Sequence, residues 1–270
     1  MTSTPRKLAG YGWVPDLPDA RDHTYSAAAP TLAALPPSAD LTAQCPPVYN
    51  QGQIGSCTAN AIAAAVEFDL RKQNLTDFAP SRLFIYYNER AMEGHVGNDS
   101  GAAIRDGVKS VHQLGVCAES EWPYDDTAAT SDGGPFPPGA RDGEKPSPQC
   151  YTDALKNKAT AYQRVTRNLD HMRACLASGY PFVFGFTVYD SFESQEVAKT
   201  GVVPMPSSTE HTLGGHAVLA VGYDDAQQRF TVRNSWGTGW GQKGYFTMPY
   251  DYLTNRGLAS DFWTITMISE

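Results

Sequence analysis

The first half of the chain carries hydrophobic side chains at helical spacing. In residues 57–72, apolar side chains recur three or four positions apart, which is the spacing of one face of a helix. Similar patterns follow further along, with Ser81 as a suitable N-cap for one helix and Gly179 as a stop for another. Helices are therefore predicted at residues 57–72, 81–92, 101–114 and 168–178.

The second half of the chain changes to short runs of β-branched and aromatic residues. Turn residues bound most of these runs, as expected for strands. Strands are therefore predicted at residues 181–189, 216–224, 229–235, 244–249 and 262–268. Two of them are separated by a short turn from Asp225 to Gln228, which predicts an antiparallel hairpin. A mainly helical half followed by a mainly strand half predicts an α+β fold with two lobes.

Two segments lack this periodicity. Residues 1–38 are rich in Pro and Ala and predict an extended N-terminal segment in front of a domain of residues 39–270. Residues 124–149 hold nine Pro or Gly residues and predict a long surface loop. The loop separates a helical lobe of about residues 50–125 from a β-rich lobe of about residues 160–268.

Composition and charge exclude several classes of partner. The 270 residues are 41% hydrophobic, but no apolar run approaches the ~20 residues of a membrane span. The net charge is −8 and the basic residues are scattered, which argues against nucleic acid and anionic membranes as partners. The N-terminus lacks the apolar segment of a secretory signal. We therefore expect a cytoplasmic chain, or one exported without a classical signal.

Cys57 stands where a glycine-containing turn, NQGQIGSC, gives way to an alanine-rich helix. A cysteine attacks as its thiolate, which the positive end of a helix dipole and a neighbouring imidazolium both stabilise. The alanines at 59, 61 and 63–65 would let this helix pack closely against other elements. A core cysteine at a helix start is the alternative, and this stretch alone does not decide between the two.

His216 and Asn234 supply the partners that a reactive cysteine needs. His216 opens an apolar strand after Gly214 and Gly215, which we expect to remove side-chain crowding around the imidazole. Asn234 closes the next strand, so the predicted hairpin sets the two side by side. A neutral amide can orient the imidazole without quenching its charge. Each residue taken singly also fits an ordinary strand end.

An oxyanion donor completes the arrangement. Gln51 carries a side-chain NH₂ on the turn before Cys57, and the backbone N–H of Cys57 is free at the helix start. Surface glutamines are common, so Gln51 alone is a weak signal. The four features together favour a nucleophilic active site, because their separate alternatives would have to coincide in one chain.

The chain has five cysteines, so at least one thiol stays free in any redox state. If Cys57 is the free thiol, three pairings remain open for Cys45, Cys117, Cys150 and Cys175. Cys117 and Cys150 flank the predicted loop and could be bridged. In a reducing compartment all four would be buried thiols.

These residues resemble the papain family of cysteine peptidases, and the order Gln, Cys, His, Asn is the family order. The resemblance covers about residues 40–268. The matching stretches are PPVYNQGQIGSC (46–57), SGAAIRDGV (100–108), GHAVLAVGY (215–223) and RNSWGTGWGQKGYF (233–246). The last of these is the most specific.

The resemblance implies a papain-like fold, with a helical N-terminal lobe, a β-rich lobe built on a barrel-like antiparallel sheet, and the active-site cleft between them. It implies a thiol protease without metal or cofactor that acts on peptides or proteins. Gln51 would be the oxyanion-hole residue, Cys57 the nucleophile, His216 the acid/base and Asn234 its orienter. Substrate binding would fall to Ser100, Gly101, Gly215, Ala217, Trp236 and Trp240.

The chain also departs from the family pattern. Ile54 replaces a cysteine that usually forms a disulfide, and Thr58 replaces an aromatic residue, so disulfide-stapled stability is not implied. The N-terminus resembles the bacterial, xylellain-like branch, in which a short segment lies over the active site. We therefore expect residues 1–38, with apolar anchors at Tyr11, Trp13 and Val14, to cover the cleft and limit activity.

Two other functions remain open at this point. One is a different acyl transfer at the same site, such as isopeptidase, amidase or transglutaminase-like chemistry. The other is a non-catalytic binding module, which the presence of every expected catalytic residue type disfavours.

Overall fold

The computed structural model describes residues 11–269. Helices and strands alternate unevenly along the chain, with most helices before residue 160 and most strands after it. The helices are α1 (Ala29–Ala33), α2 (Cys57–Lys72), α3 (Arg82–Glu93), α4 (Ile104–Leu114), α5 (Pro148–Ala154), α6 (Leu169–Ala177), α7 (Gln195–Thr200) and α8 (Tyr250–Thr254). The strands are β1 (Thr24–Tyr25), β2 (Ser38–Asp40), β3 (Ala159–Val165), β4 (Phe182–Tyr189), β5 (Thr212–Asp224), β6 (Arg229–Arg233), β7 (Tyr245–Pro249) and β8 (Ala259–Ile268).

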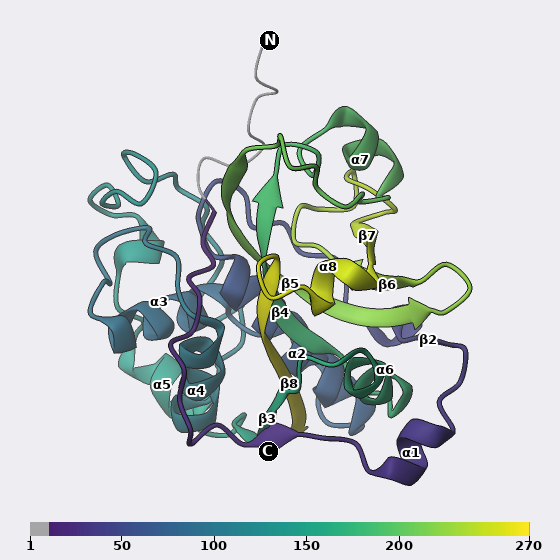
Figure 1. The fold of residues 1–270 in the computed structure, drawn as a ribbon. Helices are drawn as coiled ribbons and strands as arrows, with labels where there is room; N and C mark the ends of the chain where they lie inside the picture. The colour runs from purple at the N-terminus through teal and green to yellow at the C-terminus, as the bar shows by residue number, and fades with distance from the viewer. Residues whose placement is uncertain (1–10, 270) are drawn as a thin grey trace.

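Helix α2 lies between the helical part of the molecule and the sheet (Figure 1). Every residue from Cys57 to Leu70 is buried, which explains why small alanines fill so many of its positions. A helix that is buried on all sides can approach α3, α4, β5 and β8 at once when its side chains are small. Its N-terminus is therefore held in a fixed position relative to β5.

The strands form one sheet in the order β1-β3-β8-β4-β5-β6-β7, with β2 added beside β5. The pair β1–β3 is parallel and the other pairs are antiparallel. Among the described residues the two ends of this order do not pair, so the sheet is open and not a closed barrel. The predicted hairpin is confirmed as β5 and β6, with Leu219 opposite Arg233.

The four predicted helices are confirmed, with one displaced start. Helix α4 begins at Ile104 and not at 101, because Ala102 is in extended backbone that pairs with Trp13. The short elements β1, α1, β2, β3, α5, α7 and α8 were missed, and α1 is a helix inside the segment predicted to be extended. Helix α5 stands in a stretch rich in Pro and Gly, where Ser147 caps it and Pro148 starts it.

The N-terminal segment crosses the molecule before the domain begins. In Figure 1 its purple trace runs down past α4, turns along the base of the sheet and reaches α1 and β2. Asp22 binds it to the body through Arg105 (2.6 Å) and Arg164 (3.0 Å), and Asp16 accepts a hydrogen bond from the Trp263 indole (2.8 Å). Residues 16–25 are thus fastened by charged groups that are largely withdrawn from water.

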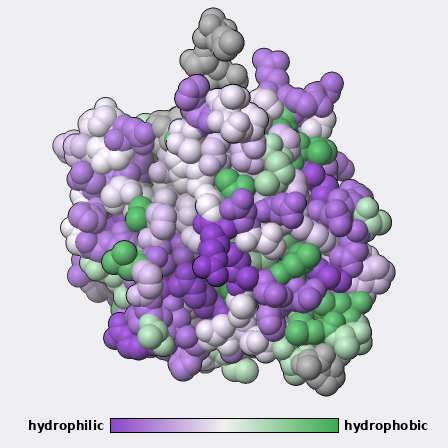
Figure 2. All heavy atoms as spheres, viewed as in Figure 1, coloured by the Kyte–Doolittle hydropathy of each residue, from purple (hydrophilic) through white to green (hydrophobic). Residues whose placement is uncertain are grey.

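The surface seen in Figure 2 is mostly hydrophilic, with its clearest hydrophobic patch at the lower right, beside α1. No helix in the described part of the chain is long and apolar enough to cross a membrane.

Candidate active site

Cys57 is the first residue of α2 and is fully buried. The turn before it is held by Asp99, whose carboxylate accepts the backbone N–H of Gly55 (2.9 Å). Gly52 has φ +62°, and a Cβ there would lie 1.7 Å from the Asp126 carboxylate, so the turn requires glycine. The first intrahelical bond runs from Asn60 N–H to Ser56 O, which leaves the N–H of Cys57 without a partner inside the helix.

His216 and Asn234 meet across the predicted hairpin, but β5 begins at Thr212, so His216 lies inside the strand and does not open it. The Nε2 atom of His216 is 2.8 Å from Oδ1 of Asn234, and both side chains are buried. The backbone N–H of Ser235 donates to the same Oδ1 (2.8 Å), which fixes the amide with its oxygen toward the ring. Because Asn Oδ1 only accepts, the Nε2 atom carries the proton and Nδ1 has the free lone pair. Nδ1 has no hydrogen-bond partner among the described residues.

Aromatic rings enclose the imidazole. The ring of Trp236 stacks on that of His216 with centroids 5.1 Å apart and planes at 30°. Phe186, on the paired strand β4, contacts it edge-on at 5.7 Å. Trp240 stands behind Trp236 with centroids 5.2 Å apart. Water is thereby kept away from the His216–Asn234 hydrogen bond.

Gln51 is buried and its amide orientation is set from two sides. The Ser235 hydroxyl donates to Gln51 Oε1 (2.7 Å), and Gln51 Nε2 donates to Ile54 O (3.0 Å). An amide NH₂ has two hydrogens, so one remains available for a ligand. Ser235 therefore connects the turn that carries Gln51 with Asn234, a link that sequence reasoning missed although the residue follows Asn234 directly.

Residues 11–14 lie in this site. The N–H of Trp13 donates to Gly215 O (2.9 Å), next to His216. The N–H of Ala102 donates to Gly12 O (2.8 Å), and the Ala102 carbonyl accepts a hydrogen bond from the N–H of Val14 (3.0 Å). The segment therefore joins the edge at Ala102 on one side of the site to Gly215 on the other.

Side chains of the segment fill the remaining space. The Tyr11 ring packs edge-on against His216 with centroids 6.0 Å apart, and its hydroxyl binds the Glu193 carboxylate. Trp13 is 9% exposed, and a Cβ on Gly185 or Gly215 would overlap it at 1.9 Å or 2.6 Å. Those glycines, like Gly214 beneath Tyr11, make room for the segment and not simply for the imidazole. Val14 was expected to anchor the segment, but its side chain is 43% exposed.

The protonation of both reactive groups reflects this enclosure. Burial raises the pKa of the Cys57 thiol to about 12, although N–H groups of Ala217 and Gly12 directed at the sulfur partly oppose the shift. Burial lowers the pKa of His216 to about 4, partly offset by the bond to Asn234. With residues 11–14 in place, the two groups are a neutral thiol and a neutral imidazole at neutral pH.

The residues predicted to bind substrate lie at different places in this arrangement. Gly215 and Ala217 flank His216, and Trp236 and Trp240 are buried behind it. At the opposite edge Gly101 has φ +67° and faces the Gly12 carbonyl closely, while the Ser100 hydroxyl binds Gly101 O (3.0 Å). The backbone hydrogen bonds of that edge are made by Ala102, one residue beyond the predicted pair.

No metal-binding cluster belongs to this site within residues 11–269. There, the single set of Cys, His or acidic side chains close enough to share an ion is Cys117, Glu121 and Cys150, none of which lies among the residues above.

Comparison with known proteins places the chain among cysteine proteases. The profile of the papain family cysteine proteases matches residues 35–265. An uncharacterized peptidase C1-like protein of Acanthamoeba polyphaga mimivirus is 45% identical over 82% of this chain and 70% of its own length. Ananain of Ananas comosus is 27% identical over 78% of this chain and 54% of its own length.

The crystal structure of xylellain, a cysteine protease from Xylella fastidiosa, has the same fold. It superimposes with a TM-score of 0.91 at 53% identity, over 97% of this chain and 98% of that one.

Proposed function

The chain belongs to the papain family of cysteine proteases, and from that premise we propose that Cys57, His216, Asn234 and Gln51 carry out peptide-bond hydrolysis. The observation that carries this proposal is the His216–Asn234 hydrogen bond of 2.8 Å. Cys57 begins α2, and the backbone N–H of Ala217, the residue after His216, is directed at its sulfur. Cys57 is the nucleophile, His216 the general base and acid, and Asn234 the group that orients the imidazole.

The first step forms an acyl-enzyme. His216 accepts the Cys57 proton on Nδ1, which the hydrogen bond to Asn234 keeps unprotonated in the neutral ring. The sulfur attacks the carbonyl carbon of the scissile bond, and the oxyanion binds the free amide hydrogen of Gln51 and the backbone N–H of Cys57. The imidazolium then gives its proton to the leaving amine.

The second step releases the acid product. His216, neutral again, takes a proton from water as the water attacks the thioester carbonyl. Collapse of the second oxyanion breaks the C–S bond and returns the proton to the Cys57 sulfur. No group beyond the four residues and water is needed for the balance of atoms and charges.

The test is a Cys57→Ala variant assayed with a fluorogenic peptide. We expect cleavage to fall to background, with the wild-type melting temperature retained. Cleavage at the wild-type rate would overturn the assignment. Mass spectrometry of products from peptide, isopeptide and glutamine-plus-amine substrates separates hydrolysis from other acyl transfers at the same residues.

We further propose that residues 11–14 act as an intramolecular inhibitor that must move before substrate binds. Support comes from the backbone bonds of this segment to Gly215 and Ala102, the two edges that a bound peptide would need. The N–H of Gly12 is directed at the Cys57 sulfur, while the Gly12 carbonyl accepts a hydrogen bond from the N–H of Ala102. The segment therefore does not present the Gly12 carbonyl to the oxyanion donors, which explains how it can occupy the site without being cleaved there.

A further inference from the structure

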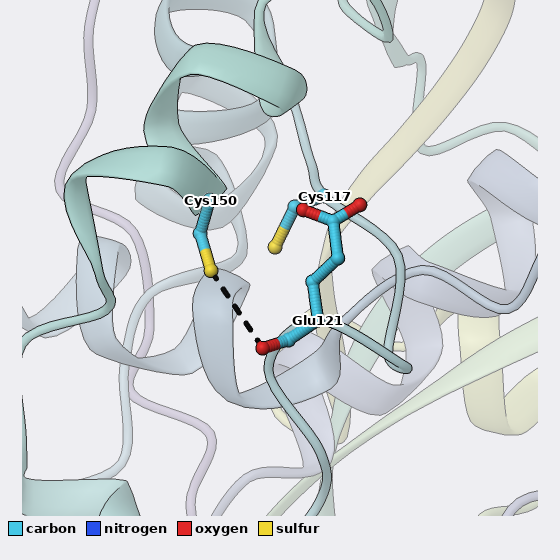
Figure 3. Close-up of side chains that lie close together, drawn as sticks. All are labelled: Cys117, Glu121 and Cys150. Carbon is cyan, nitrogen blue, oxygen red and sulfur yellow. Dashed lines mark hydrogen bonds between the residues drawn. The ribbon is translucent and has the colours of Figure 1, made fainter.

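Two buried cysteines outside the active site lie against each other. Cys117 follows α4 and Cys150 is in the first turn of α5, and they are 0% and 2% exposed. Figure 3 shows their sulfur atoms pointing into the same space from opposite sides. The two sulfurs, with a carboxylate oxygen of Glu121, lie within 4.8 Å of one another.

The backbone around both residues is fixed by hydrogen bonds. The carbonyl of Cys117 accepts a hydrogen bond from the N–H of Ser81 (2.8 Å). Two residues earlier, the N–H of Gly115 donates to the Val111 carbonyl in α4. The Cys150 sulfur is 3.2 Å from the Ser147 hydroxyl and donates to the Glu121 carbonyl at 3.8 Å. The two sulfurs therefore face each other from anchored positions.

We propose that Cys117 and Cys150 are a site of oxidative modification and form a disulfide by exchange with a small-molecule disulfide. One protein sulfur, as thiolate, attacks the small disulfide and releases one small thiol, giving a mixed disulfide. The second protein sulfur then displaces the other small thiol. One S–S bond breaks and one forms, the protein loses two electrons and two hydrogens, and two small thiols carry them away.

A disulfide fits this pair better than a metal ion. A structural zinc site needs four ligands, and among the described residues the cluster offers three, of which Glu121 is exposed. Burial first, and then the neighbouring Cys150, raise the pKa of the Cys117 thiol, so the thiolate that begins the exchange is favoured by alkaline pH. The same burial slows both the exchange that forms the disulfide and its later reduction, so both proceed when the loop opens to solvent.

The bond would close the chain across residues 118–149, and this loop supports the active-site turn. The Tyr124 hydroxyl donates to Gln51 O (2.9 Å) and lies 2.6 Å from the Ser56 hydroxyl. Cross-linking a loop of this length restricts the unfolded chain, from which we expect a melting temperature higher by about 5–10 °C. The inference does not depend on the roles proposed above for Cys57 and its partners.

The experiment uses full-length protein carrying Cys57→Ala, so that the candidate nucleophile neither reacts nor cleaves. Native protein is incubated with oxidised or reduced glutathione, alkylated, digested without reduction and analysed by mass spectrometry. We expect a linked Cys117–Cys150 peptide in the oxidised sample and a melting temperature above that of the reduced one. Cys150→Ser should abolish both effects, whereas Cys45→Ser, at a half-buried thiol, should preserve them.

Two results would overturn the proposal. One is the absence of the linked peptide after oxidation, including the case in which either cysteine is found joined to another residue. The other is a reduced protein that binds Zn²⁺ in a 1:1 ratio and thereby protects both thiols from alkylation, which would make the cluster a metal site. Because the linked peptide is sought in protein with both cysteines intact, poor folding of Cys150→Ser leaves the first readout valid.

Discussion

Trp13→Ala should release the active site without altering any residue proposed to act in catalysis. A buried Trp side chain hides about 150–250 Å², which is worth about 4–6 kcal/mol at 25 cal/mol per Å². The Trp13 Nε1 atom is buried without a partner among the described residues, which destabilises the covered state by about 1–3 kcal/mol. Trp13→Ala removes this penalty together with the buried surface. The covered state should therefore lose about 1–5 kcal/mol, a shift of about 5- to 5,000-fold in the opening equilibrium.

The assay is kcat/KM on a fluorogenic peptide, measured well below saturation. Because apparent affinity scales with the fraction of enzyme that is open, kcat/KM should rise until opening is complete, with little change in kcat. Leu17→Ala is the matched control, since Leu17 stands on the same segment and is 80% exposed. Unchanged kcat/KM for Trp13→Ala would refute the reasoning, as would an equal rise in both variants.

Gly185→Ala is an independent way to displace the segment. The added Cβ would lie 1.9 Å from the Trp13 ring, so the ring must leave even though Trp13 is intact. Truncation at residue 38 is a poorer test, because it removes Asp16 and Asp22 as well. Arg105, 7% exposed, would lose its ion pair, and removing one partner of a buried pair costs about 3–5 kcal/mol.

Three further outcomes are expected. Asn234→Ala should lower kcat about 5- to 150-fold with little effect on KM, because a hydrogen bond worth about 1–3 kcal/mol no longer orients His216. An unchanged kcat would show that Asn234 does not take part in the reaction. Glu89, fully buried beside Thr58, has a pKa raised well above its usual range by burial, so it folds neutral but ionises when unfolded at neutral pH. Glu89→Gln should therefore melt higher than wild type at pH 8, with the difference shrinking toward pH 4.5, and equal melting curves would contradict a neutral Glu89. The pKa of His216 is lowered to about 4, so the covered state should become less stable as pH falls from about 6.5 to 4, by up to ~1.4 kcal/mol per pH unit. Hydrogen exchange of residues 11–14, corrected for intrinsic rates, should therefore become faster over this pH range.

The parts of the fold that follow from local pattern were predictable from the sequence. Helix α2 was predicted from its hydrophobic periodicity and the β5–β6 hairpin from its turn. Together these elements bring Cys57, His216 and Asn234 into one region. Strand β3 was missed because its side chains are mostly half-buried and mixed in polarity. Helices α5 and α7 were missed because one or two turns leave no measurable period.

Contacts between distant segments were the harder part. Gly185 interrupts a strand of aromatic and β-branched residues, which is a sign of close approach by another group that was not recognised from the sequence. Which group enters depends on where residues 11–14 run, and that is decided by backbone bonds to Ala102 and Gly215 that no local pattern encodes. Ser235 is similar, because its role requires Gln51 to be opposite it.

If residues 11–14 inhibit as proposed, covering the site should also suppress the reactivity of Cys57. A thiolate–imidazolium pair places two charges at Cys57 and His216, and burial opposes both of them, since it raises the pKa of the thiol and lowers that of the imidazole. The Asn234 bond and the N–H groups directed at the sulfur favour the charged pair but do not outweigh burial under Tyr11 and Trp13. Removing the segment admits both substrate and water to the same two atoms. Displacement of residues 11–14 should therefore increase binding and nucleophile reactivity together, and a variant that gains peptide binding without faster alkylation of Cys57 would show that the two are separable.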